Sequence, residues 1–450
     1  MTDGRTSLAD GNLTDLFLGS LSELAARGVP SRIAHCARMC LVDYLGCYAA
    51  GRKVAGEKLL RLASGVGRAA STDALAYGIA AHVVELDDGH RYGMLHLGAP
   101  VISALLATAA HHAMSADDFT RGVVLGYEVT IRLARAVQPG CKLKGCHATG
   151  VCGTVGAALA IAYALRFDAA QIKSAFSAAA TSAAGLLEMI EGDTELKPYN
   201  AGRAAMDGLV AAFAGQARFA PPLDALGGRR GFLAVMTDEA RTEHLAGMDG
   251  GTYGIETIYR KPYAACRHCH APIEAALDIA GQPGFDVAQV KRILVETYRL
   301  AISGHDHVLA TSVNSAKMSI PYSVAAALIR RSGGMDSFSE SAIADGALRG
   351  LAGKVAVHES AEFTAQCPAK RIASVRVEMA DGNSFSSQVD YPKGEPENPM
   401  ADDELERKMR ALAAWGGVGE NAVDALWAEV SKADFDVRRI FSILNMTAEP

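Results

Sequence analysis

Hydrophobic residues recur at three- and four-residue intervals through most of the first 250 positions. This spacing is typical of amphipathic helices, and glycine often stands where one of these segments closes. We therefore predict that the N-terminal half is α-helical. The segments with this pattern are LTDLFLGSLSELAARG (13–28), IAHCARMCLVDYLGCYAAG (33–51), VISALLATAAHHA (101–113), AAQIKSAFSAAATSAAGLLEMIEG (169–192) and AMDGLVAAFAGQARF (205–219).

The pattern changes near residue 257. VKRILVETYRL (290–300) and RIASVRVEMADGNSFSSQVDYPKG (371–394) alternate apolar with polar residues and contain many β-branched ones, as strands do. The second segment also holds ADGN, a signal for a hairpin turn. Between them, NSAKMSIPYSVAAALIRR (314–331) predicts a loop that enters a helix.

Helical periodicity returns after the Pro/Glu-rich connector PKGEPENP, in ADDELERKMRALAAW and AVDALWAEVSK. We expect these last helices to pack on the N-terminal ones. The predicted fold class is mainly α with a smaller α+β domain. The predicted domains are a helical one, formed by residues 1–256 and 396–450, and an α+β one, formed by residues 257–395.

Composition narrows the class of protein. Half of the 450 residues are hydrophobic, 6% are aromatic and 45 are glycine, which favours closely packed helices. The net charge is -6 with both signs interleaved, so we expect no nucleic-acid partner. The longest apolar stretch, residues 151–167, is too short for a membrane span. With no secretory pattern in the first twenty residues and nine scattered cysteines, we predict a cytoplasmic protein with reduced thiols and no membrane partner.

Histidines and carboxylates gather in HVVELDDGHRYGMLHLGAP, residues 82–100. If the preceding helix runs to about residue 88, His82, Glu85 and Asp88 share one face. GAP then begins a new helix, and His96 lies just before it, where free backbone N–H groups favour an anion. This is a candidate site for a carboxylate substrate. The alternatives are a solvated helix end and a divalent-metal site, although the spacing matches no strong zinc motif.

Four other segments carry candidate chemistry. In CKLKGCHATG, Lys142, Lys144 and His147 precede a glycine-punctuated helix. The tripeptide KPY occurs twice and is expected to present Lys197 and Lys261 from loops, because the residue before a proline favours extended backbone. CRHCH (266–270) suggests zinc or redox chemistry, but no second Cys/His pair stands at finger-like spacing, which favours a polar loop. His305, His307 and Tyr322 are uninformative individually.

Taken together, the chain resembles the MmgE/PrpD family, which includes 2-methylcitrate dehydratase, aconitate decarboxylase and iminodisuccinate epimerase. The resemblance covers nearly the whole chain. The segments that carry it are LVDYLGCYAAG, AHVVELDD, HLGAPVISALLA, KGCHATGVCGTVGAALAIA, TELKPYNAGRAAMDGLVAAFAG, YRKPYAACRHCHAPIEAALD and AKMSIPYSVAAAL.

The resemblance implies a large helical domain with a smaller α+β lid domain, usually in a homodimer, and an active site between the two domains. It implies no metal and no organic cofactor. The residues that match the family's catalytic positions are His96, His147, Lys197, Lys261 and Tyr322. The residues expected to bind the substrate beside them are Glu85, Asp88, Lys144, Arg267 and His268.

One departure concerns the substrate. The family commonly reads DFDDT where this chain has ELDDG, so Glu85 and Gly89 replace an aspartate and a threonine. The loop from there to His96 is also longer than in the decarboxylase pattern. A longer acid and a lost hydroxyl change the space and hydrogen bonding around a substrate, so the resemblance assigns neither aconitate nor methylcitrate.

The expected function is a cofactor-independent lyase that dehydrates or decarboxylates a small di- or tricarboxylate through a carbanion next to a carboxylate. Lys197 and Lys261 would hold the substrate and stabilise the developing charge, while His96 and His147 would move protons. One alternative is an isomerase that epimerises a dicarboxylate such as iminodisuccinate. Two others are a metal-dependent hydrolase and a non-catalytic helical dimer that binds carboxylates.

Overall fold

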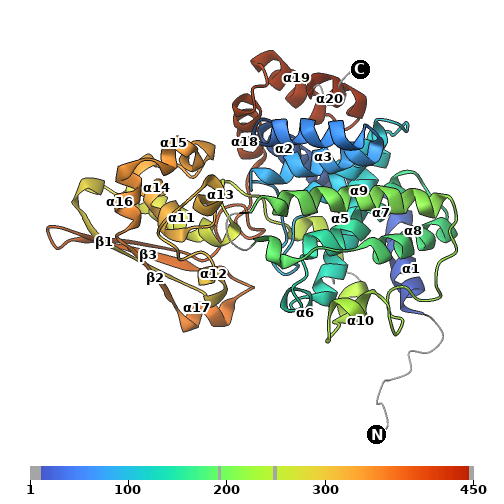
Figure 1. The fold of residues 1–450 in the computed structure, drawn as a ribbon, viewed down its shortest axis with the longest axis horizontal. Helices are drawn as coiled ribbons and strands as arrows, with labels where there is room; N and C mark the ends of the chain where they lie inside the picture. The colour runs from blue at the N-terminus through green and yellow to red at the C-terminus, as the bar shows by residue number, and fades with distance from the viewer. Residues whose placement is uncertain (1–11, 191–193, 247–250, 445–450) are drawn as a thin grey trace, which may run out of the picture.

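The structure is a computed structural model that describes residues 12–190, 194–246 and 251–444. A large helical part lies beside a smaller part built on a four-stranded sheet (Figure 1). This arrangement confirms the predicted fold class of a mainly helical chain with a smaller α+β portion. The helices of the first half are α1 (Leu13–Ala26), α2 (Ser31–Val66), α3 (Ala70–Val83), α4 (Gly98–Ala109), α5 (Ala116–Val137), α6 (Gly140–Leu143), α7 (Ala148–Ala164), α8 (Ala169–Ser182), α9 (Leu196–Gln216) and α10 (Phe232–Met236).

Helix α7 forms the centre of the helical part. All of its residues are buried, and it packs against α4, α5, α8 and α9. Small residues make this close packing possible, since a Cβ added at Gly156 would lie 1.8 Å from Thr130 Oγ1 and one at Gly208 would lie 2.5 Å from Ala157 Cβ. The abundance of alanine and glycine in the sequence therefore corresponds to helices whose backbones approach one another closely.

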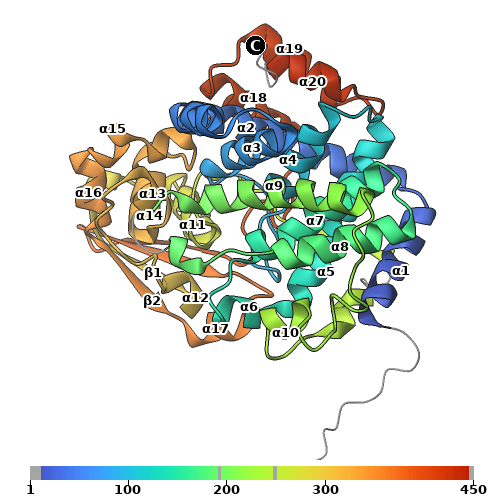
Figure 2. The same cartoon turned by 45° about the vertical axis from the view of Figure 1, so that its right-hand side comes forward.

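The last helices pack against the first ones, as predicted. Helix α18 (Asp402–Trp415) lies along α2, α19 (Glu420–Val430) also contacts α2, and α20 (Val437–Leu444) contacts α4. Figure 2 shows these red helices beside the blue α2. Apolar residues of α18, α19 and α20 belong to the same hydrophobic core as α2, α4, α5 and α7.

The sheet has the strand order β2-β1-β3-β4, with β1 parallel to β2 and antiparallel to β3, and β3 antiparallel to β4. Residues of β3 alternate between buried and more exposed, because α11 and α14 cover one face of the sheet. The hairpin predicted at ADGN joins β3 to β4. The bounds are β1 (Val290–Thr297), β2 (Val355–Glu359), β3 (Ala373–Met379), β4 (Ser384–Val389), α11 (His270–Ala280), α12 (Arg299–Ile302), α13 (Val313–Lys317), α14 (Ile320–Arg330), α15 (Glu340–Ile343), α16 (Gly346–Ala352) and α17 (Ala361–Gln366).

Three local predictions were wrong. Helix α3 ends at Val83 and not near residue 88, because Glu85 adopts a left-handed backbone with φ 59°. Helix α8 ends at Ser182 and Ala183 is extended; residues 191 and 192 of that predicted segment lie outside the described ranges. Lys197 lies in the first turn of α9 and not in a loop, since a proline is tolerated there, where backbone N–H groups have no partner within the helix.

Within the described ranges, no helix combines the length and hydropathy needed to cross a bilayer. The apolar stretch 151–167 instead supplies the buried helix α7. The domain limits at residues 257 and 395 stay a prediction. The sheet-bearing core takes in Val84 and Leu86 from the segment after α3, so this segment connects the two parts of the fold.

Candidate active site

The end of α3 places a buried carboxylate between two lysines. Glu85 follows the helix in its left-handed conformation, and its backbone N–H donates to the carbonyl of His82. The Glu85 carboxylate pairs with Lys197 from the start of α9 and with Lys261 from the segment before α11. Lys261 Nζ lies 3.1 Å from Glu85 Oε2 and 3.1 Å from the Glu85 carbonyl oxygen. Two ammonium groups distant in sequence therefore converge on one carboxylate.

Both partners stay charged in this setting. Burial alone would raise the pKa of Glu85, but the charges of Lys197 and Lys261 hold it well below its usual value. Burial alone would lower the pKa of Lys261, which is 1% exposed, but the charge of Glu85 raises it above its usual value. An opposite charge at this distance favours the ionised form of each group.

A third lysine, Lys317, ends α13 and faces the same group. Its Nζ donates to the carbonyl of Val84 at 3.1 Å, and the side chain is buried. Burial lowers its pKa to about 8; Glu85 opposes this shift, whereas Lys261 and Lys197 add to it. Lys317 is therefore mostly charged at neutral pH and loses its charge as the pH passes about 8. We call Lys197, Lys261 and Lys317 the site lysines.

His96 is held by the acidic segment before α4. Its Nδ1 lies 2.7 Å from the Asp88 carbonyl oxygen and 3.3 Å from Asp87 Oδ2. A carbonyl only accepts hydrogen bonds, so Nδ1 carries the proton and Nε2 is left as the basic nitrogen. Burial lowers the pKa of His96 to about 4, although Asp87 opposes the shift, so the imidazole is neutral near pH 7.

His147 precedes α7 and has an equivalent arrangement. Its Nδ1 lies 2.7 Å from Asn200 Oδ1, while Asn200 Nδ2 donates to the carbonyl of Ala184. The orientation of this amide makes Nδ1 the protonated nitrogen and Nε2 the base. Burial lowers the pKa of His147 to about 3. Gly150 permits the contact, because a Cβ there would lie 2.2 Å from Asn200 Oδ1.

One group in the described part of the chain has donor atoms close enough for a metal ion: His82, Asp87 and His96, with one atom of each within 4.8 Å of the others. His82 Nδ1 lies 2.8 Å from Asp87 Oδ2. The Nδ1 atom of His96 already faces a carbonyl oxygen and carries a proton. The geometry therefore suits an Asp87 carboxylate that orients two imidazoles better than it suits three ligands of one cation.

Four of the predicted site residues converge with Glu85: His96, His147, Lys197 and Lys261. Glu85 experiences the charges of both lysines, and His147 experiences those of Lys197 and His96. Asp88 has a different place, because its carboxylate accepts from Gly98 N–H at 2.9 Å and from Tyr127 Oη at 2.5 Å. Its two oxygens are thus engaged by the start of α4 and by Tyr127, and its role as a substrate ligand stays a prediction.

The remaining predicted residues also have other partners. Arg267 pairs with Glu395 at 2.8 Å, and Lys144 pairs with Asp238 at 2.7 Å. The Tyr322 hydroxyl donates to the Ser337 carbonyl at 2.8 Å inside the core beside the sheet. His268 Nδ1 lies 2.6 Å from Tyr298 Oη. None of these four side chains contacts Glu85, although His268 experiences the charge of Lys261. The Tyr322 hydroxyl proton is already donated to Ser337.

The glycine that replaces the family's usual threonine is required by Tyr259. Gly89 and Tyr259 exchange backbone hydrogen bonds of 3.0 and 2.8 Å. A Cβ at Gly89 would lie 2.4 Å from Tyr259 Oη and 2.8 Å from the Leu95 carbonyl oxygen. The ring of Tyr259 therefore fills the space that a larger side chain at position 89 would need.

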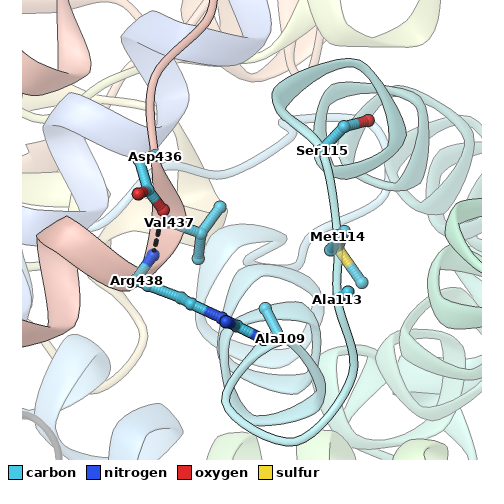
Figure 3. Close-up of a pocket in the computed structure, with 7 residues that line it drawn as sticks. All are labelled: Ala109, Ala113, Met114, Ser115, Asp436, Val437 and Arg438. Atoms are coloured by element: carbon cyan, nitrogen blue, oxygen red, sulfur yellow. Dashed lines mark hydrogen bonds between the residues drawn. The ribbon is translucent and has the colours of Figure 1, made fainter.

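A pocket of about 400 Å³ lies elsewhere, between the end of α4 and the start of α20 (Figure 3). Alanine, methionine and valine side chains line much of it, and Asp436 accepts from the backbone N–H of Arg438 at 2.8 Å. None of the site lysines lines this pocket, and neither does His96 or His147. The pocket is therefore separate from the buried acid–base groups around Glu85.

Sequence reasoning missed Lys317, Asn200 and Asp87. Lys317 stands in AKMSIPY and Asn200 in KPYNAG, both of which are segments that carry the family resemblance. Neither residue belongs to a spaced motif, and their role becomes visible only when α9 and α13 are placed beside the end of α3. In the sequence, Asp87 is one member of an acidic cluster, and nothing there marks it as the carboxylate that orients two histidines.

Comparison with known proteins gives two family matches. Residues 20–245 match the MmgE/PrpD N-terminal domain and residues 263–432 match the MmgE/PrpD C-terminal domain. The chain is 27% identical over 457 residues to the cis-aconitate decarboxylase of Aspergillus terreus, covering 90% of each chain. It is 26% identical over 450 residues to the cis-aconitate decarboxylase-like protein oryM of Aspergillus oryzae (strain ATCC 42149 / RIB 40), covering 91% of this chain and 92% of that one.

Proposed function

The chain belongs to the MmgE/PrpD family, and from this premise we propose that it is a lyase acting on a small di- or tricarboxylate. The similarity to cis-aconitate decarboxylases supports an enzyme of the lyase class. The reaction we propose forms a carbanion next to a carboxylate and needs no metal or organic cofactor. The proposed catalytic residues are His96, His147, Lys197 and Lys261, with Lys317 added from the structure.

The observation that carries this proposal is the convergence of Lys197 and Lys261 on the Glu85 carboxylate. It supports a site in which the same two ammonium groups bind a carboxylate of the substrate. An ammonium group has three N–H donors, and Lys261 uses two of them on Glu85. Each lysine thus keeps donor capacity for a ligand. Together the three site lysines outnumber the carboxylates of Glu85 and Asp87, which favours an anion.

The neutral histidines supply the proton transfers. Removing a proton next to a carboxylate places negative charge on its oxygens, and fixed ammonium groups lower the energy of that charge. The Nε2 atom of His96 or His147 can accept the proton, since each Nδ1 is occupied by a hydrogen bond. In dehydration the imidazole that has taken this proton at Nε2 gives it to the leaving hydroxyl, which departs as water. In decarboxylation no proton is removed first: carbon dioxide leaves, and an imidazole that has taken a proton from solvent at Nε2 donates it to the carbanion.

Glu85 favours a particular kind of substrate. Its carboxylate already forms ion pairs with Lys197 and Lys261. A bound acid must therefore share these two lysines with Glu85. This arrangement favours a substrate that has a carboxylate within reach of Lys317. A substrate that contacts only Lys197 and Lys261 would bind less well.

The second candidate function is epimerisation of a dicarboxylate. Nε2 of one imidazole would remove the proton, and the other imidazole, protonated beforehand from solvent, would donate its own proton to the opposite face of the carbanion. The Asp88 carbonyl supports His96 and the Asn200 amide supports His147. This reaction uses the same carbanion and differs only in having no leaving group. For both candidate functions we also propose that the protein is a homodimer and that residues 257–395 form a lid.

Proton NMR in H2O with the purified protein and a panel of acids tests the function. The panel contains cis-aconitate, citrate, 2-methylcitrate, iminodisuccinate, malate and tartrate. A lyase that dehydrates produces new vinyl signals from citrate or 2-methylcitrate, and a decarboxylase converts cis-aconitate with release of carbon dioxide. An epimerase changes only the diastereomer ratio of an acid with two stereocentres, iminodisuccinate or tartrate. Unchanged spectra for all six acids would contradict the proposal and favour a carboxylate-binding protein.

A further inference from the structure

One of the nine cysteines differs from the others in its surroundings. Cys266 stands at the start of the 3-10 helix η5 (Arg267–Cys269), and its Sγ lies 3.2 Å from His305 Nε2. His305 Nδ1 lies 2.8 Å from the Ser303 carbonyl oxygen. Because that oxygen only accepts, Nδ1 carries the imidazole proton and Nε2 is the nitrogen that takes the thiol proton.

The electrostatic setting favours the thiolate and the imidazolium. Burial would raise the pKa of Cys266, but His305 and then Lys197 and Lys261 lower it to about 6. Burial would lower the pKa of His305, but the charge of Cys266 raises it above its usual value. By contrast, burial raises the pKa of Cys40 and of Cys141 to about 12. Of these three cysteines, Cys266 is therefore the one whose thiol is a nucleophile near neutral pH.

The pair is joined to the candidate active site. The backbone N–H of Cys266 donates to the Lys317 carbonyl at 2.8 Å, and Lys261 precedes Cys266 by five positions. Cys266 is partly exposed, whereas Cys269, the other cysteine of the CRHCH segment, is fully buried. His268 turns its Nδ1 to Tyr298 and does not compete for the sulfur. An anion attracted by the site lysines thus comes to the vicinity of a polarised thiol.

We propose that Cys266 and His305 form a nucleophilic site at which α,β-unsaturated carboxylates add covalently to the sulfur. This inference rests on the proposed function, since elimination from a hydroxy acid leaves a carbon–carbon double bond next to a carboxylate. The sulfur would form a bond to the β-carbon, and the π electrons would move to the α-carbon. The His305 imidazolium then gives its proton to the α-carbon. No oxidant or other reactant is needed, and the product is a thioether.

The first test is alkylation of the full-length protein by iodoacetamide as a function of pH. The rate at the Cys266 peptide is followed by mass spectrometry. It should rise with a midpoint near pH 6, and in His305→Gln the midpoint should move up toward the ordinary thiol value of about 8.5. A midpoint near 8.5 in the unaltered protein would overturn the assignment of a thiolate–imidazolium pair.

The second test uses fumarate and its uncharged analogue fumaramide as electrophiles. Intact-mass measurement should show one fumarate added, lost in Cys266→Ser and kept in Cys36→Ser, a matched control at a partly exposed cysteine of α2. The preference for fumarate over fumaramide should exceed that of free cysteine by at least about tenfold, because ammonium groups attract the dianion. Excess citrate should slow the reaction.

The outcomes separate this inference from the proposed function. Fumarate addition at Cys266 in a protein that transforms no acid of the panel would support the thiol site and count against the lyase. Turnover without any adduct at Cys266 would support the lyase and overturn the thiol site. Equal addition in Cys266→Ser would also overturn it, because another residue would then be the nucleophile.

Discussion

The Nζ atom of Lys261 lies 3.1 Å from two oxygens of Glu85, one on the side chain and one on the backbone. The left-handed backbone at Glu85, φ 59°, turns both oxygens toward the lysine. The lysine is buried at 1% exposure and stays charged because this acid is beside it. The relationship explains how the fold retains a charged lysine in a buried site, where it stabilises developing negative charge more strongly than in water.

Lys261→Gln should lower kcat/KM by at least about 10²-fold, because the substitution removes a fixed positive charge from the site. Steady-state kinetics on the acid identified by the panel would measure the effect, with circular dichroism to check folding. Lys432→Gln is the matched control, since Lys432 is half-exposed and pairs with Glu429 at 2.8 Å on the C-terminal helices. Equal kinetics for the two variants would remove Lys261 from the site.

His147→Ala should reduce kcat by about 10²- to 10⁴-fold, the range expected when a general acid or base is lost. A variant of its partner gives a sharper test. Asn200→Asp places a carboxylate 2.7 Å from Nδ1 and should raise the pKa of His147 by about 1 to 3 units.

Because the neutral imidazole is the base, a higher pKa moves the acidic limb of the kcat profile to higher pH. In the unaltered protein this limb should lie below pH 5, given values of about 3 and 4 for His147 and His96. A pH profile that Asn200→Asp leaves unmoved would show that His147 does not take part in proton transfer.

Substrate affinity should fall above about pH 8. The pKa of Lys317 is lowered to about 8, first by burial, so its charge is lost as the pH passes this value and KM for an acid rises. Lys317→Met should abolish this rise. Glu85→Gln should shift it to lower pH, since the negative charge of Glu85 raises the pKa of Lys317. KM measured from pH 6 to pH 9.5 tests this prediction. A rise in KM that persists in Lys317→Met would mean that another group titrates.

Gly89→Ala should destabilise the fold by about 1 to 3 kcal/mol, because the new Cβ would lie 2.4 Å from Tyr259 Oη. The thermal unfolding midpoint measures this change. Combining Gly89→Ala with Tyr259→Ala should cost less than the two single effects together, by at least about 0.5 kcal/mol. Strict additivity would mean that the Leu95 carbonyl, also 2.8 Å from the new Cβ, and not the ring, excludes a side chain at position 89.

The sequence was sufficient to predict the elements whose pattern is long and regular. The strands at Val290–Thr297 and Ala373–Met379 follow from two-residue periodicity, and the helix Leu13–Ala26 follows from three- and four-residue periodicity. The end of α3 did not follow, because Glu85 adopts a left-handed backbone that its residue type rarely takes. The contacts with Lys197 and Lys261 hold it there, and they depend on tertiary structure.

The candidate site was predictable only in part, because some of its contacts also depend on tertiary structure. His96, His147, Lys197 and Lys261 were selected by resemblance, and the structure brings them together around Glu85. Tyr322 belongs to a segment that matches the family, yet its hydroxyl donates to Ser337. Lys317 could not be selected from the sequence, because its importance lies in burial and in the carbonyl of Val84, which is 233 positions away in the chain.

We propose that the protein makes a carbanion next to a carboxylate with its own lysines and histidines. The most direct measurement is exchange of solvent deuterium into the panel acids in D2O, followed by proton NMR with the unaltered protein and with His147→Ala. The account predicts deuterium at a carbon next to a carboxylate in one of the acids, and at least about 10²-fold slower exchange in the variant. Decarboxylation or epimerisation in D2O that leaves every such carbon without deuterium, or turnover and exchange that His147→Ala leaves unchanged, would contradict it.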